Sequence, residues 1–95
     1  MKKQVSTSPA RLAEKLRQIR KSLKLSQNQI LSELGFKERL FRSNISQYER
    51  GDREPPLLVL LAYARLAETP LEILIDDNLE LLLEDQQIIH ERNKP

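Results

Sequence analysis

Residues 26–51 read SQNQILSELGFKERLFRSNISQYERG, and this stretch contains the signals for two short helices. Ser26 and Gln29 have the spacing of a capping box, in which the serine hydroxyl and the glutamine side chain each bind the other residue's backbone N–H. Gly35 can adopt the left-handed conformation that commonly ends a helix. Between them, apolar residues recur at helical spacing: Ile30, Leu31 and Leu34. The stretch therefore predicts a helix of about two turns.

A second short helix is predicted after a polar and basic connection at residues 36–41. Ile45 and Tyr48 lie three residues apart, which places both on one helix face, and Gly51 ends the helix. The other positions are polar: Arg42, Ser43, Asn44, Ser46, Gln47 and Arg50. The major groove of DNA admits one helix, and in it Arg pairs with guanine while Asn or Gln pairs with adenine. The polar face therefore suits base reading.

Three more helices are predicted around this pair. The first begins with Ser8 as N-cap and Pro9 in the first turn, and ends near Leu23. Its apolar stripe is Leu12, Leu16, Ile19 and Leu23, which leaves a side facing solvent or phosphate: Arg11, Lys15, Arg17, Lys21 and Lys24. Another helix follows Pro55 and Pro56, and its residues 57–64 are apolar on every side, which is typical of burial on more than one face.

A short fifth helix is predicted from Thr69 as N-cap, through Pro70, to about residue 75. Residues 77–92 allow two patterns. Leucines 79, 81 and 83 alternate as in a strand, whereas leucines 79, 82 and 83 with Ile89 fit a helix, which we favour. The predicted organisation is a flexible basic arm at residues 1–8, a DNA-binding domain at 9–76 and an acidic, leucine-rich segment at 77–95 that serves as a dimerisation element.

Charge is divided unequally along the chain. Residues 1–56 carry thirteen Lys or Arg against six Asp or Glu, a balance of +7, while residues 57–95 carry three against eight, a balance of −5. The whole chain has a net charge of only +2. Such asymmetry suggests one face that meets a polyanion and another that stays away from it, although two ordinary solvated surfaces would look the same.

Composition excludes several function classes. The 95 residues suit one domain, and 39% apolar with 32% charged residues suit a helical one. Without cysteine there is no disulfide, thiolate metal site or cysteine nucleophile. No apolar run is long enough for a membrane span or a secretory signal, so we expect a cytoplasmic protein that does not contact membrane. His90 stands alone, and no nucleophile–base arrangement or metal-ligand cluster is visible, so we expect no enzyme, no cofactor and no metal.

The ordered motifs resemble the lambda-repressor-like helix-turn-helix domains of the Cro and xenobiotic-response-element type. The resemblance covers residues 10–76 and rests on these stretches: 25–27 (LSQ), 34–35 (LG), 45–51 (ISQYERG), 53–55 (REP) and 60–64 (LLAYA). It implies an all-α, five-helix DNA-binding domain with a short C-terminal extension, and a double-stranded DNA operator as the partner.

The resemblance also implies roles for individual residues. It places Arg42, Ser43 and Gln47 where the family reads base edges, with Asn44 and Ser46 alongside them as further base-reading candidates. It assigns phosphate contact to Gln27, which also braces the reading helix, and to Arg50; we add Asn28, Lys37, Arg39 and Arg53 as phosphate candidates, Lys37 and Arg39 being equally consistent with ordinary loop charge. It implies an internal ion pair between Arg20 and Glu49, which agrees with the repulsion that a carboxylate facing phosphates would suffer.

The chain departs from the family pattern in two places. Gly35 and Ile45 are ten positions apart, whereas the family usually has six, so the turn carries four extra residues. Leu31 also stands where the family usually has alanine, which suggests wider spacing of the two helices. Both changes leave the start of the reading helix open: Arg42 is either its first residue or lies one turn further in.

The sequence therefore favours a dimeric transcriptional regulator, most simply a repressor, with residues 57–92 carrying the dimer surface. Two alternatives stay open. One is an antitoxin-like or adaptor protein whose acidic C-terminal segment binds another protein, and the other is a helical module without a DNA role.

Overall fold

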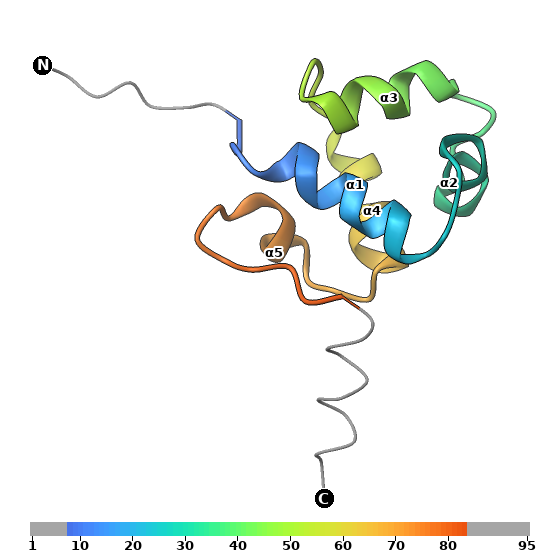
Figure 1. Cartoon of the computed structure of the whole chain (residues 1–95). Coiled ribbons are helices and arrows are strands. Elements are labelled where there is room, and N and C mark those ends of the chain that lie inside the picture. Colours follow the sequence, from blue (N-terminus) through green and yellow to red (C-terminus); the bar gives the residue numbers. More distant parts are fainter. Residues whose placement is uncertain (1–7, 84–95) are drawn as a thin grey trace, which may run out of the picture.

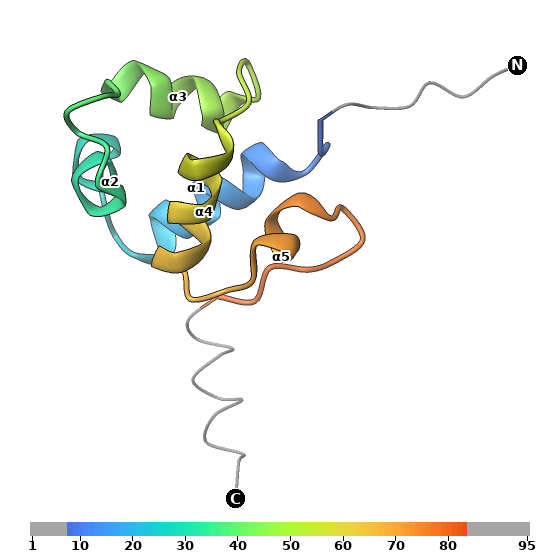
Figure 2. The ribbon, with the colours of Figure 1, turned by 180° about the vertical axis from the view of Figure 1, so that it is seen from behind.

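A computed structural model describes residues 8–83 of the protein (Figure 1). This part contains five helices and no strand: α1 (Leu12–Ser22), α2 (Gln27–Leu34), α3 (Arg42–Arg50), α4 (Leu57–Leu66) and α5 (Leu71–Ile75). Both Figure 1 and the reverse view in Figure 2 place α3 along one edge of the molecule and α5 toward the opposite edge. The predicted all-α, five-helix architecture is confirmed.

All five helices contribute to one hydrophobic core. The regular spacing of leucine and isoleucine in α1 and α2 turns their apolar stripes inward, and α3 adds the residues at its i and i+3 positions. The buried apolar residues are Leu12, Leu16, Ile19, Ile30, Leu31, Leu34, Ile45, Tyr48, Val59, Leu60, Tyr63, Ala64 and Leu74. This shared core fixes α3 against α1 and α2 while its outer face stays accessible.

The ends of α2 are those that the sequence predicts. The Gln29 N–H donates to Ser26 Oγ at 3.0 Å, and the Ser26 N–H donates to Gln29 Oε1 at 2.7 Å, which completes the capping box. Gly35 ends the helix with φ at 85°, a left-handed conformation that glycine adopts without strain. Gly51 does the same for α3, with φ at 77°.

The predicted start of α1 is wrong. The helix begins at Leu12, with Arg11 in the N-cap position, rather than after Ser8. The N–H groups of Ala10 and Arg11 donate to the Asp77 carboxylate at 2.8 and 3.0 Å, so an acceptor from the far end of the chain satisfies the first turn. Thr69 is likewise not the cap of α5, because that helix begins at Leu71 with Pro70 before it.

Lys15, predicted on the solvent or phosphate side of α1, is instead 1% exposed. Its Nζ donates to the backbone carbonyls of Ile73, Asp76 and Leu79 at 2.7, 3.0 and 2.9 Å. One ammonium group thus satisfies three backbone carbonyls that do not take part in helical hydrogen bonds. These bonds hold the end of α5 and the segment after it against Lys15.

The prediction of a helix over residues 77–92 is wrong for residues 77–83, which are not helical. Residues 84–92 lie outside the described part of the chain. Leu81 and Leu83 pack against the core, while Leu82 between them is 55% exposed. The alternation of these leucines therefore reflects a non-helical segment laid along the domain, held at Lys15 and Asp77.

Helix α4 buries one face rather than several. Val59, Leu60, Tyr63 and Ala64 form that face, whereas Leu57 and Leu58 are 67% and 64% exposed. The expectation of burial on more than one face does not hold within a single chain. Among residues 8–83, no helix has the length and apolar character needed to cross a membrane.

Candidate nucleic-acid interface

The outer face of α3 carries the residues expected to read bases. Arg42 and Ser43 are exposed, Asn44, Ser46 and Gln47 are half-buried, and Ile45 and Tyr48 point into the core. Ser43 and Gln47 are four residues apart, so they share a face of the helix. Neither of these two side chains has a hydrogen-bond partner within residues 8–83. Their polar groups are therefore available to a ligand.

The start of α3 is set by a side-chain cap. Arg42 is its first residue, which answers the question that the longer turn left open. The N–H of Phe41, the residue before it, donates to Asn44 Oδ1 at 2.9 Å. Asn44 therefore uses its acceptor to cap its own helix, and only its amide donors remain for a ligand. Sequence reasoning missed this role, although an amide side chain at the third helical position is a recognisable capping pattern.

Gln27, the first residue of α2, connects two parts of α3. Its Nε2 donates to Glu49 Oε1 at 3.2 Å, and its Oε1 accepts from Arg42 Nη1 at 3.3 Å. The amide thus ties both ends of α3 to the start of α2. In this arrangement Gln27 orients Arg42, and the second N–H of its amide nitrogen stays available as a donor to a phosphate.

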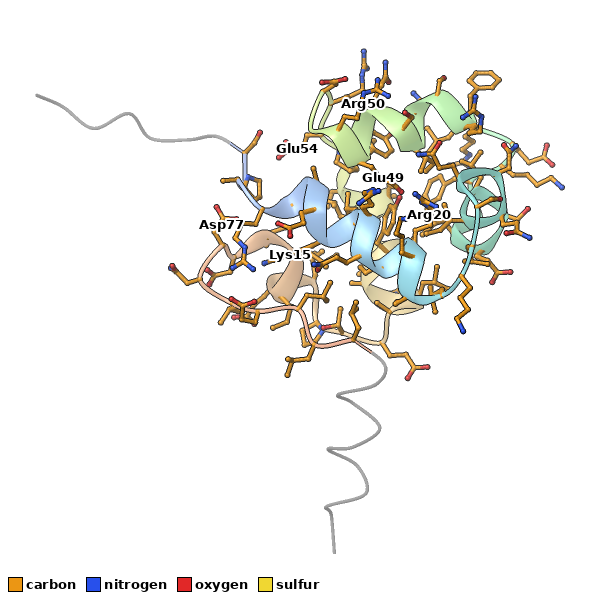
Figure 3. All side chains as sticks on the ribbon, in the orientation of Figure 1. Lys15, Arg20, Glu49, Arg50, Glu54 and Asp77 are labelled. Carbon is orange, nitrogen blue, oxygen red and sulfur yellow. The ribbon has the colours of Figure 1, made fainter. Side chains whose placement is uncertain are left out.

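Glu49 also binds Arg20 on α1 (Figure 3). Arg20 Nε and Nη2 donate to the two carboxylate oxygens at 2.6 and 2.9 Å, and Nη1 donates to the Leu25 carbonyl at 3.0 Å. The side chains are 14% and 4% exposed, and the hydrogen bond to Glu49 raises the pKa of Arg20 against the opposing effect of burial. Glu49 therefore points inward, away from the outer face of α3.

Arg50, expected to contact phosphate, is exposed at the end of α3 (Figure 3). Its guanidinium donates to Asp52 Oδ2 at 2.9 Å and to the Ser46 hydroxyl. Asp52 places a negative charge beside the cation, and the Ser46 hydroxyl accepts from Arg50 while its own O–H stays available as a donor. These two bonds were not foreseen from the sequence.

The other phosphate candidates flank α3. Lys37 and Arg39 are exposed in the turn before it, Arg53 is exposed in the loop after it, and Asn28 is exposed in the first turn of α2. The turn itself is compact, because the N–H groups of Arg39 and Leu40 both donate to the Phe36 carbonyl at 2.9 Å. The four extra residues therefore fold into an ordered turn that presents two cations.

Carboxylates gather near the opposite edge of the molecule. In Figure 3, Asp77 lies beside the start of α1, away from Arg50. The N–H groups of Arg11 and Ala10 lower the pKa of the Asp77 carboxyl. Glu80 accepts two hydrogen bonds from Arg11, the shorter 3.1 Å, and this interaction lowers its pKa too. The uneven charge of the sequence thus becomes a spatial separation between α3 and the segment after α5.

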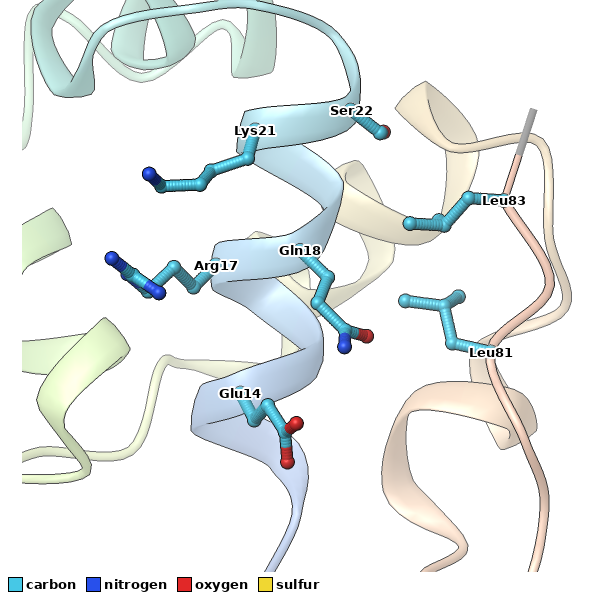
Figure 4. A pocket seen from close by; sticks show the side chains of 7 residues that line it. All are labelled: Glu14, Arg17, Gln18, Lys21, Ser22, Leu81 and Leu83. Carbon is cyan, nitrogen blue, oxygen red and sulfur yellow. The ribbon is translucent and has the colours of Figure 1, made fainter. Parts of the chain in front are cut away.

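Residues 8–83 hold no group of three or more His, Asp or Glu side chains arranged to bind a metal. A groove between α1 and residues 81–83 is visible in Figure 4. A single carboxylate, that of Glu14, lines it, so the groove offers no carboxylate pair for general acid–base chemistry. Its other lining residues are Arg17, Gln18, Lys21, Ser22, Leu81 and Leu83.

Comparison with known proteins agrees with this geometry. The chain is similar to the P22 c2 repressor, whose crystal structure was determined in complex with synthetic operator 9T: the TM-score is 0.60 at 29% sequence identity, over 70% of this chain and 94% of that one. No curated protein sequence gives a significant match. A family model described as "Helix-turn-helix domain" matches residues 13–80. The chain belongs to this helix-turn-helix family, in the lambda-repressor-like form that the c2 repressor represents.

Proposed function

We propose that the protein is a transcriptional regulator that binds double-stranded DNA, most simply as a repressor, and reads sequence with α3 in the major groove. Its membership of the helix-turn-helix family and its similarity to an operator-bound repressor support DNA binding. Within such domains the second helix of the motif enters the major groove, and its first residues contact base edges.

The observation that carries the proposal is the state of Ser43 and Gln47. Both side chains lie on the outer face of α3 without a hydrogen-bond partner in residues 8–83, and Ser43 directly follows the cation Arg42. An amide with a free donor and a free acceptor can bind adenine at two points, and an arginine at the helix start can bind guanine. Asn44, through its amide donors, and Ser46, through its own O–H, would complete the base-reading set.

Phosphate contacts would come from the polar and cationic groups around α3. Lys37, Arg39, Arg53 and Asn28 are exposed and need no rearrangement. Arg50 would donate to a phosphate from Nη2, which neither Asp52 nor Ser46 engages, and Gln27 would donate from the second N–H of its amide. These contacts would position the domain, and their number would set the salt dependence of binding.

The proposed repressor acts as a dimer, so that two copies of α3 meet successive grooves of a near-palindromic operator. Leu57, Leu58 and Ile75 are exposed apolar side chains on α4 and α5, and they support a dimer surface on residues 57–92. Light scattering at micromolar concentration should give about twice the chain mass. A monomer at all accessible concentrations would contradict the dimeric part of the proposal.

Selection from random duplex DNA tests the function. The full chain is incubated with the pool at moderate salt, bound DNA is recovered over several rounds, and the enriched site is measured by fluorescence anisotropy against its scrambled version. We expect one enriched motif and at least about thousandfold preference over the scramble. The variant Gln47→Ala should lose part of that preference, whereas the control Gln18→Ala, an exposed amide on α1, should keep it. A pool without enrichment would contradict sequence-specific binding.

The alternative, an antitoxin-like or adaptor role for the acidic C-terminal segment, has less support. Asp77 and Glu80 are already engaged by the start of α1, which leaves them less available to a partner protein.

A further inference from the structure

Phe41 has the most exposed large apolar side chain in residues 8–83, with 74% of its surface accessible. It is held in place at the backbone, because its N–H donates to Asn44 Oδ1 and its carbonyl accepts from the Asn44 N–H, both at 2.9 Å. An aromatic ring is thus presented by a fixed backbone immediately before Arg42. Leaving it in water forgoes the free energy that burial would supply.

The exposed residues nearest to Phe41 in the sequence are mostly cationic. Lys37, Arg39 and Arg42 are all exposed within four residues of it, with one carboxylate, Glu38, among them. An apolar protein surface docking here would bury these cations, at a high cost in desolvation. A partner that brings both negative charge and a small apolar group fits better, and DNA does so.

We propose that Phe41 contacts the C5-methyl group of a thymine in the operator, next to the base pairs read by Arg42 and Ser43, and so makes the protein specific for thymine at that position. The proposal rests on the proposed function, since it needs α3 in the major groove. There the thymine methyl is the one apolar group on the base edges, and phenylalanine is among the residues that contact it. The position before the first helical residue lies at the end of α3 that meets the bases.

The four extra residues of the turn give this contact a structural origin. They form a compact turn whose N–H groups donate to the Phe36 carbonyl. The turn ends at Phe41, which occupies the N-cap position of α3. The turn therefore does more than lengthen the connection: it supplies an apolar specificity element together with the two cations Lys37 and Arg39.

Replacement of thymine by uracil, which removes only the methyl group, tests the contact. Each thymine of the selected operator is replaced in turn, and affinities are measured for the wild type, Phe41→Ala, Phe41→Leu and the same-turn control Glu38→Ala. For the wild type we expect about fourfold loss at one thymine per half-site, the change that corresponds to burial of one methyl-sized group. For Phe41→Ala, replacement of that thymine by uracil should cause no further loss of affinity. For Phe41→Leu and Glu38→Ala, the same replacement should still lower the affinity.

Three results would overturn the proposal: no thymine sensitive to replacement in the wild type, a sensitive thymine that stays sensitive in Phe41→Ala, or loss of affinity in Phe41→Ala that is equal for operator and scrambled DNA. Phe41→Ala should keep the wild-type unfolding temperature because the ring is exposed, and this control excludes misfolding. Failure of the proposed function looks different, because then no operator is selected in the first place.

Discussion

Arg20 and Glu49 form a two-point ion pair that joins α1 to α3, with nitrogen–oxygen distances of 2.6 and 2.9 Å. The carboxylate also accepts a hydrogen bond from Gln27, so three helices meet at one anion. Charge inside a domain is costly to desolvate, and a pair of this kind is best regarded as a device that fixes orientation rather than as a large source of stability. Here it fixes the helix that carries the candidate base-reading residues.

Removal of one partner from this pair should destabilise the protein. Glu49→Gln leaves the Arg20 guanidinium largely buried without its counterion, and we expect a loss of about 3 kcal/mol in the free energy of unfolding, measured in urea. The double variant Arg20→Met/Glu49→Leu removes both charges and should recover much of that loss. Equal stabilities of Glu49→Gln and the wild type would contradict this account of the pair.

Lys15 gives a second stability prediction. In Lys15→Met the three carbonyls of Ile73, Asp76 and Leu79 lose their common donor, and we expect a loss of about 2 to 4 kcal/mol in the free energy of unfolding. Amide hydrogen exchange should become faster in α5 first, because its anchor is removed. The exposed neighbour Glu14 serves as a control: Glu14→Gln should leave both measurements unchanged.

Asp77 predicts a pH dependence. Hydrogen bonds from the N–H groups of Arg11 and Ala10 lower its pKa in the folded state. A lowered carboxyl pKa means that the stabilisation is complete above the unfolded value of about 3.9 and is lost as the pH falls through the folded value. Asp77→Asn should therefore lower the unfolding temperature near pH 6 and flatten its fall between pH 4 and pH 2, at roughly constant ionic strength. Parallel curves for the variant and the wild type would contradict this linkage.

The fold follows from local patterns wherever a helix is delimited by residues close in sequence. Ser26 and Gln29 cap α2 across three positions, and Gly35 and Gly51 end α2 and α3 by their own conformations. The start of α1 could not be predicted in this way, because its acceptor, Asp77, is 66 positions away from Arg11. The burial of Lys15 escaped the sequence pattern for the same reason: its partners are carbonyls, which every residue has.

The candidate site shows the same division. The polar face of α3 follows from residue spacing, and the Arg20–Glu49 pair was expected from the family resemblance. The first residue of α3 could not be predicted. A turn with four extra residues allows the helix to begin at more than one position, and only the capping residue decides between them. That cap is Asn44, a residue whose type and place on the helix predict base contact alone. The engagement of Arg50 by Asp52 depends on a chain reversal at Gly51.

Replacement of Lys37 and Arg39 tests whether the turn before α3 contacts phosphates. If both side chains bind phosphate, the double variant Lys37→Ala/Arg39→Ala should weaken operator and scrambled DNA together. It should also reduce the log–log slope of affinity against salt by about 1.8. Binding is measured by anisotropy between about 50 and 200 mM salt, the range in which phosphate contacts dominate the change. An unchanged slope would mean that both cations face solvent in the complex.

Gln47 and Arg50 separate base reading from positioning within one helix. Gln47 has a free amide, so Gln47→Ala should cost about 1 to 3 kcal/mol on the selected operator, with little effect on scrambled DNA and relaxed preference at one base pair. Arg50→Ala should weaken all sequences nearly equally and lower the salt slope by roughly 0.9, the value for one phosphate contact.

The bond between Arg50 and Asp52 adds a matched variant to that comparison. Asp52→Asn frees the guanidinium and removes a negative charge near the backbone, so it should strengthen binding to operator and scramble alike. The share of this gain that comes from the freed guanidinium should vanish in the Arg50→Ala background, so the gain should be smaller there. If Gln47→Ala instead weakens every sequence alike while Arg42→Ala alone relaxes specificity, α3 is rotated in the groove. Base reading would then depend on Arg42 and exclude Gln47, and Gln27 would orient Arg42 by the hydrogen bond that links α2 to α3.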